Sequence, residues 1–322
     1  MLLSQHTQEI ILAQKSKDYA LKTTAELFDY LGDFIAYCDT SKSTIETYLK
    51  SLKVFFDYLL DNGITQPNRE DLILFRNYLF DKGLQSTTIA SYINAIKQFF
   101  KWTNNKHLYE DIAQHLKGAK VNSQYHRKEA LTKEQAQEIL DSIKGDTLES
   151  KRNYALMLLA LCCGLRTIEI SRANLNDITF KSGSKALMIQ GKGKLDKADF
   201  VKLPYQVEKA IREYLLMRGI YKATDPLFTS ISDRNNGGRL TTHSISRIIK
   251  NAFRKCGLDS ELLTAHSTRH TFITLFLLNG GTLEEARQIA RHNSINTTMI
   301  YNHAIDRAKN NGEQVLADLL IK

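Results

Sequence analysis

Apolar residues recur at the spacing of an amphipathic helix throughout residues 25–116, and few glycines or prolines interrupt them. This period predicts a series of helices, each with one buried face. Their predicted bounds are residues 25–37, 43–63, 68–82 and 86–102, followed by a short helix at 109–116. Ser43 and Glu46 form a capping-box pattern at the start of the second helix, and Gly83 follows the third. The first part of the chain is therefore predicted to be an all-α bundle.

The rest of the chain mixes two periods. Residues 155–163 are almost entirely apolar and predict a buried helix that ends at Gly164. Across residues 180–204 the pattern changes to alternation, which predicts a β-hairpin. Further helices are predicted at residues 206–217 and 242–256, and after the helix-start residues Thr132 and Thr282. The predicted fold class is mainly α with a small antiparallel β-sheet.

Length and local composition predict how these elements divide into domains. At 322 residues the chain is long enough for two domains. A basic stretch with no apolar period separates the helical part from the mixed part, as an interdomain linker does. The predicted segments are an N-terminal arm at 1–22, a helical domain at 23–117, a linker at 118–129 and a second domain at 130–322.

The charge balance bears on the partner. The formal net charge is +9, with 43% hydrophobic and 25% charged residues, which are ordinary globular values. Excess positive charge favours an anionic partner, usually nucleic acid, although a merely basic soluble protein has the same balance. The four cysteines form no CxxC pair, which is typical of a reducing compartment. With neither a signal-peptide pattern nor an apolar run of about 18 residues, we expect a cytoplasmic protein with no membrane partner.

The chemistry concentrates in residues 264–303. Three cationic side chains fall within five positions, and a further histidine precedes a tyrosine by nine residues. These residues are His266, Arg269, His270, His292 and Tyr301. Cations that hold a phosphate next to a phenol predict a nucleophile that attacks a phosphodiester.

This arrangement resembles the C-terminal signature of the tyrosine recombinases, which include phage integrases, Xer proteins and Cre. The resemblance implies an upstream arginine, and Arg166 follows Gly164 at the end of the predicted buried helix. It also implies a lysine on a β-hairpin, and Lys192 lies between two glycines in the predicted hairpin. The resemblance covers about residues 23–310. It implies a helical core-binding domain and a mixed α/β catalytic domain that close around DNA as a C-shaped clamp, closer to Xer or Cre than to lambda integrase.

The same resemblance implies a role for each site residue. Tyr301 would attack a DNA phosphate, forming a 3′-phosphotyrosine link and releasing a 5′-hydroxyl. Arg166 and Arg269 would hold the non-bridging oxygens, since their planar forks suit phosphate. Lys192 would protonate the leaving 5′-oxygen. No metal or other cofactor is implied.

Three further residues surround this group of catalytic candidates. His266 and His292 would complete the phosphate pocket and assist proton transfer, and Glu169 would orient a cation or a histidine. An alternative for His266 and His270 is metal binding, because they are four residues apart on one helical face. The pair lacks the adjacent glutamate of HExxH and an obvious third ligand, so we expect no metal.

The chain departs from the family pattern in three places. Arg291 stands before His292 where the family usually has glycine, and Thr268 replaces a usual leucine. Thr167 and Ile168 are acceptable variants within the segment from Arg166 to Glu169. The sequence leaves open whether Arg291 adds a DNA contact or alters the local turn.

Basic residues outside the catalytic group are candidates for DNA contact, with an ordinary solvated face as the alternative for each. They are Lys50, Lys53, Lys97, Lys101, Lys194, Arg239 and Arg247.

The function that this pattern predicts is site-specific cutting and rejoining of duplex DNA through a Holliday junction, by a homotetramer with a dimer on each site. The alternatives are a type IB topoisomerase and a DNA-binding accessory protein with a degenerate site; the complete set of catalytic residue types argues against the second. Apolar residues at 315–321 would pack on their own domain or on a neighbouring protomer. The DNA target, the order of strand exchange, an accessory or partner recombinase, and the choice between chromosome-dimer resolution and mobile-element integration stay open.

Overall fold

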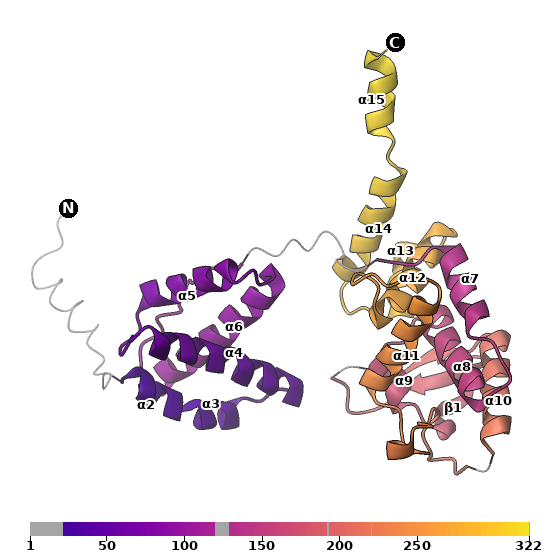
Figure 1. Ribbon diagram of the computed structural model, residues 1–322, viewed down its shortest axis with the longest axis horizontal. Helices are drawn as coiled ribbons and strands as arrows, with labels where there is room; N and C mark the ends of the chain where they lie inside the picture. The colour runs from indigo at the N-terminus through magenta and orange to yellow at the C-terminus, as the bar shows by residue number, and fades with distance from the viewer. Residues whose placement is uncertain (1–21, 120–128, 192, 220, 322) are drawn as a thin grey trace, which may run out of the picture. The chain divides into compact units, whose positions relative to one another are not determined.

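The computed structural model describes residues 22–119, 129–191, 193–219 and 221–321 (Figure 1). The chain divides into two compact units, Met1–Asn122 and Ser123–Lys322. The predicted N-terminal arm, apart from residue 22, and most of the predicted linker lie outside the described residues.

The N-terminal unit is a bundle of helices around an aromatic core. The helices among its described residues are α2 (Thr24–Asp29), α3 (Leu31–Tyr37), α4 (Lys42–Asp61), α5 (Arg69–Asp81) and α6 (Ser86–Asn105). Helices α4 and α6 pack against each other, and Phe56 and Phe99 meet edge to face with ring centroids 5.5 Å apart. Both rings are fully buried, so the apolar period seen in the sequence is the one that forms this core.

Three local predictions for this unit were wrong. The first predicted helix is two helices that meet at Tyr30. The N-cap of α4 is Ser41, whose side chain accepts from the Thr44 N–H, and Ser43 lies inside the helix. Residues 112–115 form a turn in place of the predicted fifth helix. The turn ends at His115, whose φ of 60° lies in the left-handed region that terminates a right-handed helix.

The C-terminal unit combines a helical core with a small sheet. Its helices are α7 (Lys133–Ser142), α8 (Leu148–Cys162), α9 (Thr167–Arg172), α10 (Tyr205–Arg218), α11 (Thr242–Lys255), α12 (Ala265–Leu278), α13 (Leu283–Ala290), α14 (Ile295–Lys309) and α15 (Gly312–Leu320). Helix α8 is central, because α7, α9, α10 and α12 all pack against it. This explains why residues 155–161 are apolar on every side, and all of them are buried.

The sheet has one strand more than predicted. Strands β1 (Ile178–Lys181), β2 (Ser184–Ile189) and β3 (Asp199–Lys202) lie in that order and are antiparallel. A two-residue turn at Ser182-Gly183 joins β1 to β2, with positive φ at both residues as a type I′ turn requires. The sequence did not reveal β1 because its four residues are only half-buried or exposed and do not alternate. No described helix is long and apolar enough to cross a membrane.

Candidate active site

The turn between α8 and α9 brings Arg166 to α12. Gly164 has a φ of +60°, and a Cβ at this position would lie 2.4 Å from the Phe272 ring on α12. Only glycine permits both the left-handed backbone and this close approach. Arg166 is the N-cap of α9, and its position therefore depends on the close packing of the turn against α12.

Helix α12 buries one of the two arginines expected to hold phosphate. The Arg269 side chain is 1% exposed. It donates to the Gly164 carbonyl at 2.7 Å and to the Ala290 carbonyl, which ties the α8–α9 turn and the end of α13 to α12. Its Nε is buried and has no hydrogen-bond partner among the described residues. Burial, followed by the neighbouring Arg166 and Arg291, lowers the pKa of Arg269 to about 9, so the guanidinium stays charged at neutral pH.

Glu169 lies between two guanidinium groups. Its carboxylate accepts from Arg166 Nη1 and from Arg291 Nη2, each at 2.9 Å, and also from the Arg166 backbone N–H. Burial raises the pKa of Glu169, but the guanidinium of Arg291, the Arg166 backbone N–H and the guanidiniums of Arg166 and Arg269 together outweigh burial and lower it. Three arginines thus share one carboxylate, and the excess positive charge favours a bound anion such as phosphate.

Helix α14 places Tyr301 beside these arginines. The phenol is 4% exposed, and its oxygen lies 2.6 Å from His270 Nδ1. Burial raises the pKa of Tyr301 to about 12, while Arg269 and Arg166 act to lower it. The phenol therefore carries its proton at neutral pH and needs a proton acceptor before it can attack.

The two predicted histidines occupy different surroundings. His292 is buried, its Nδ1 lies 2.9 Å from Thr298 Oγ1, and its ring stacks on Tyr301 with centroids 6.3 Å apart. His266 is exposed and packs edge to face on His270 at 4.5 Å. Among the described residues, no group of three His, Cys, Asp or Glu side chains could hold a metal with this pair.

The structure thus brings Arg166, Glu169, Arg269, His292 and Tyr301 into one cluster. Lys192 lies outside the described residues.

Sequence reasoning gave two other members of the cluster, His270 and Arg291, no catalytic role. His270 follows the predicted site residue Arg269, and Arg291 precedes the predicted site residue His292. Adjacency in the chain is the signal that the sequence offers for both. The neighbours of Arg269 and His270 are set only when α12 packs against the surrounding helices. The sequence marks Arg291 as a departure from the family pattern but does not show which way its side chain points.

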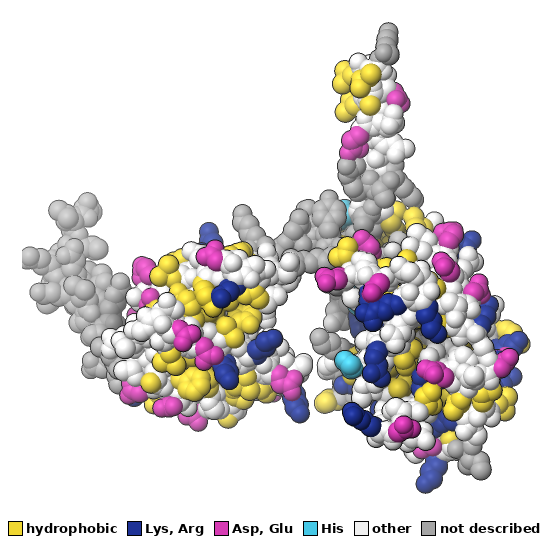
Figure 2. All heavy atoms as spheres, in the orientation of Figure 1, with side chains coloured by type: hydrophobic (Ala, Val, Ile, Leu, Met, Phe, Trp, Pro, Cys, Tyr) yellow, Lys and Arg dark blue, Asp and Glu magenta, His cyan; other side chains and the backbone are white. Residues whose placement is uncertain are grey.

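The candidate DNA-contact residues are mostly accessible. Lys50, Lys53 and Lys101 are exposed and Lys97 is half-buried on α4 and α6, while Lys194 and Arg247 are exposed in the C-terminal unit. Figure 2 shows lysine and arginine side chains interspersed with acidic ones on the displayed faces of both units.

Arg239 differs from the other candidates. Its guanidinium donates to the carbonyls of Ser171 and Ala173 and to the Asn174 side chain, at 2.6–3.2 Å. These bonds anchor the preceding loop to the end of α9. A contact between Arg239 and DNA stays a prediction.

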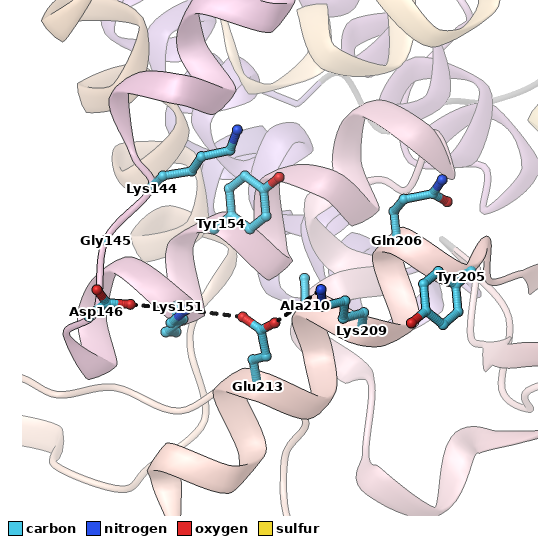
Figure 3. A pocket seen from close by; sticks show the side chains of 10 residues that line it. All are labelled: Lys144, Gly145, Asp146, Lys151, Tyr154, Tyr205, Gln206, Lys209, Ala210 and Glu213. Atoms are coloured by element: carbon cyan, nitrogen blue, oxygen red, sulfur yellow. Dashed lines mark hydrogen bonds and ion pairs between the residues drawn. The ribbon is translucent and has the colours of Figure 1, made fainter.

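A cleft of about 660 Å³ lies between α8 and α10 (Figure 3) and shares no residue with the cluster. Each lysine that lines the cleft is paired with a carboxylate. Lys151 lies 3.2 Å from Asp146 and 3.0 Å from Glu213, Lys144 lies 2.6 Å from Asp141, and Lys209 lies 4.0 Å from Glu213. The cleft therefore offers little to an anionic ligand.

Both units match known protein families. Residues 129–307 match the phage integrase family, and residues 27–107 match the phage integrase N-terminal SAM-like domain. Tyrosine recombinase XerC of Thermodesulfovibrio yellowstonii is 26% identical over 288 residues, covering 85% of this chain and 91% of the relative. Tyrosine recombinase XerA of Pyrococcus furiosus is 29% identical over 278 residues, covering 85% and 88%.

Solved structures share the fold. The XerH site-specific recombinase bound to a palindromic difH substrate in a post-cleavage complex aligns with a TM-score of 0.73 at 19% identity, over 91% of this chain and 98% of that one. A lambda integrase tetramer bound to a Holliday junction aligns with a TM-score of 0.65 at 16% identity, over 91% and 83%. These likenesses confirm the predicted fold class.

Proposed function

The chain belongs to the phage integrase family, and we propose that it is a site-specific DNA recombinase that cuts and rejoins duplex DNA through a 3′-phosphotyrosine intermediate. The observation that carries this function is a buried phenol, Tyr301, close enough to Arg166 and Arg269 for their positive charges to act to lower its pKa. A nucleophile, cations for the phosphate and a protein shell that excludes water are the requirements of phosphoryl transfer to a side chain. The relatives described above are named recombinases, which favours recombination over DNA relaxation by a topoisomerase.

In this reaction the cations act on the charge that develops at phosphorus. Attack by the Tyr301 oxygen gives a pentacoordinate transition state with more negative charge on the non-bridging oxygens. The buried Arg269 Nε, with no hydrogen-bond partner among the described residues, is suited to one of these oxygens. Arg166 is held by Glu169 while 29% of its side chain stays exposed, so its outer N–H groups are suited to another.

The remaining groups would complete the pocket and transfer protons. Lys192, within Gly-Lys-Gly on the β2–β3 connection, would protonate the leaving 5′-oxygen. His292 stacks on the nucleophile and is fixed by Thr298, which suits a positioning role. His266 is exposed at the first turn of α12, where a DNA phosphate could approach it. Rejoining reverses each step, so no cofactor is required.

The partner is double-stranded DNA bound by both units, which would close on it as a clamp. The basic charge and the exposed lysines of α4 and α6 support this, as does the DNA in the XerH complex. We place a dimer on each site and a homotetramer at the junction. The lambda integrase tetramer on a Holliday junction and the exposed apolar residues of α15 support that assembly.

Trapping the covalent intermediate tests the chemistry. A binding site would first be obtained by in vitro selection and then built into a nicked duplex that loses a short fragment on cleavage. The wild-type protein should form a covalent protein–DNA band on a denaturing gel. Tyr301→Phe should bind the same duplex with equal affinity and form no band, because the substitution removes only the oxygen. A band that persists in Tyr301→Phe would reject Tyr301 as the nucleophile.

A further inference from the structure

A buried histidine with no assigned role is hydrogen-bonded to the nucleophile. His270 Nδ1 lies 2.6 Å from the Tyr301 oxygen, and the two side chains are 3% and 4% exposed. Their rings are tilted by 41° with centroids 5.3 Å apart, so Nδ1 and the phenol oxygen meet at the ring edges. A general base must lie within about 2.6–3.2 Å of the proton-bearing atom, and His270 meets this condition in the resting protein.

The other two histidines of the cluster are arranged differently. His292 directs its Nδ1 to Thr298 Oγ1 at 2.9 Å and presents the face of its ring to Tyr301. His266 is exposed, and its ring packs edge to face with the His270 ring. The sequence predicts proton transfer by these two histidines, whereas the 2.6 Å contact with the phenol oxygen belongs to His270.

The packing of α12 explains why His270 is buried. Residues 267–271 of this helix are all buried, since α8, α11, α13 and α14 pack around it. His270 follows Arg269 directly, so one buried turn supplies both a cation for the phosphate and a nitrogen for the phenol. His270 contacts the His266 ring on its own helix and the Tyr301 phenol on α14. The other charged and titratable groups of the cluster are Arg166, Glu169, Arg269, Arg291 and His292.

We propose that His270 is the general base that takes the proton from Tyr301 as the phenol oxygen attacks the DNA phosphate. This inference rests on the proposed recombinase function. The Tyr301 oxygen forms a bond to phosphorus while the bond from phosphorus to the 5′-oxygen breaks. The phenolic proton moves to His270 Nδ1, and the 5′-oxygen takes a proton from the separate acid, Lys192. When the 5′-hydroxyl attacks the phosphotyrosine on rejoining, His270 returns the proton to the leaving phenol.

Single-turnover cleavage of two substrates separates the base from the acid. One is the nicked duplex above, and the other carries sulfur in place of the bridging 5′-oxygen. A thiolate leaves without protonation, so sulfur compensates for a lost acid but not for a lost base. His270→Gln keeps a hydrogen-bonding side chain that accepts no proton at neutral pH. This variant should slow cleavage of both substrates by roughly 10²–10⁴-fold. Lys192→Ala should cleave the oxygen substrate slowly, but its cleavage rate should return towards that of wild type on the sulfur substrate.

Three controls complete the experiment. The exposed His243 gives a matched substitution, and His243→Gln at saturating protein should cleave within about twofold of wild type. The wild-type cleavage rate should fall at low pH as the base becomes protonated, and His270→Gln should lose this dependence. A fluorinated tyrosine at position 301 loses its proton more readily and so depends less on a base. It should reduce the difference in cleavage rate between wild type and His270→Gln. A loss of stability in His270→Gln would not produce this effect.

Each other outcome has a definite meaning. Cleavage by His270→Gln within threefold of wild type would overturn the base assignment. Recovery of His270→Gln on the sulfur substrate would make His270 the acid and would equally overturn it. If Tyr301→Phe is inactive and either result is seen, the base assignment alone fails; a covalent band with Tyr301→Phe would instead reject the proposed function.

Discussion

The Arg291 guanidinium lies 2.9 Å from the Glu169 carboxylate, although Arg291 occupies a backbone conformation that glycine usually fills. Its φ of 55° and ψ of 45° are left-handed, and it caps the end of α13. The turn that the family's glycine would make is therefore retained. The side chain is 11% exposed and points inward to Glu169, which favours a structural ion pair over the DNA contact that the sequence left open.

Two substitutions at Arg291 separate the backbone from the ion pair. Both Arg291→Ala and Arg291→Gly remove one of the two guanidinium partners of Glu169, and each should lower the free energy of unfolding by about 1–3 kcal/mol. Alanine keeps the left-handed strain and glycine relieves it, so the glycine variant should be more stable than the alanine variant by about 1 kcal/mol. Denaturant unfolding measures both. Equal stability of the two variants would show that the backbone at Arg291 carries no strain.

The ion pair also predicts a pH dependence. The folded-state pKa of Glu169 is lowered, so its contribution to stability is present above its unfolded value near 4.5 and is lost as pH falls through the folded value. Without Arg291 that folded value should rise. The difference in melting temperature between wild type and Arg291→Gly should therefore be large at pH 7 and should shrink towards pH 3. A difference that stays constant across this range would contradict the ion pair as its cause.

The lysines of α4 predict a change in salt dependence. A clamp built on lysine and arginine releases counterions when it binds, so affinity should fall steeply with salt. If Lys50 and Lys53 each contact a phosphate, Lys50→Gln with Lys53→Gln should reduce the log–log slope by about 1.8. Lys82→Gln, an exposed lysine after α5, is the matched control and should leave the slope unchanged. Fluorescence anisotropy over a range of salt concentrations measures the slope, and an unaltered slope in the double variant would exclude both contacts.

The apolar residues of α15 predict a role in assembly. Leu316 and Leu320 are 58% and 76% exposed, and Figure 2 shows hydrophobic side chains gathered on this helix. Because their exposure leaves little packing to lose, Leu316→Ser with Leu320→Ser should keep the melting temperature of the monomer and single-site binding. Pairing of two DNA sites and recombination should be lost, as with deletion of residues 313–322. Differential scanning fluorimetry and a two-site synapsis assay measure these. A lowered melting temperature with intact synapsis would show that the helix packs on its own domain.

Local patterns determined which elements form. The apolar period predicted α5 and α11 to within one residue at each end, because one face of each packs into a core. For α8 the apolar run located only the buried part and the C-terminal end, since the helix begins at Leu148, before that run. Thr132 and Thr282 were identified as helix starts, since their capping needs only residues three positions away. The order of Arg166, Arg269, His292 and Tyr301 was likewise visible in the chain, because a family signature is a linear pattern.

The tertiary structure decided where polar side chains point. His266 and His270 are one helical turn apart, yet only α12 packed among its neighbours buries the second beside Tyr301 and leaves the first exposed. Arg239 and Arg291 look like surface cations in the sequence but turn inward, to backbone carbonyls and to Glu169. A long cationic side chain can extend into solvent or reach a buried acceptor several ångströms away. Which of the two occurs here depends on acceptors far along the chain: Ser171 lies 68 positions from Arg239, and Glu169 lies 122 positions from Arg291.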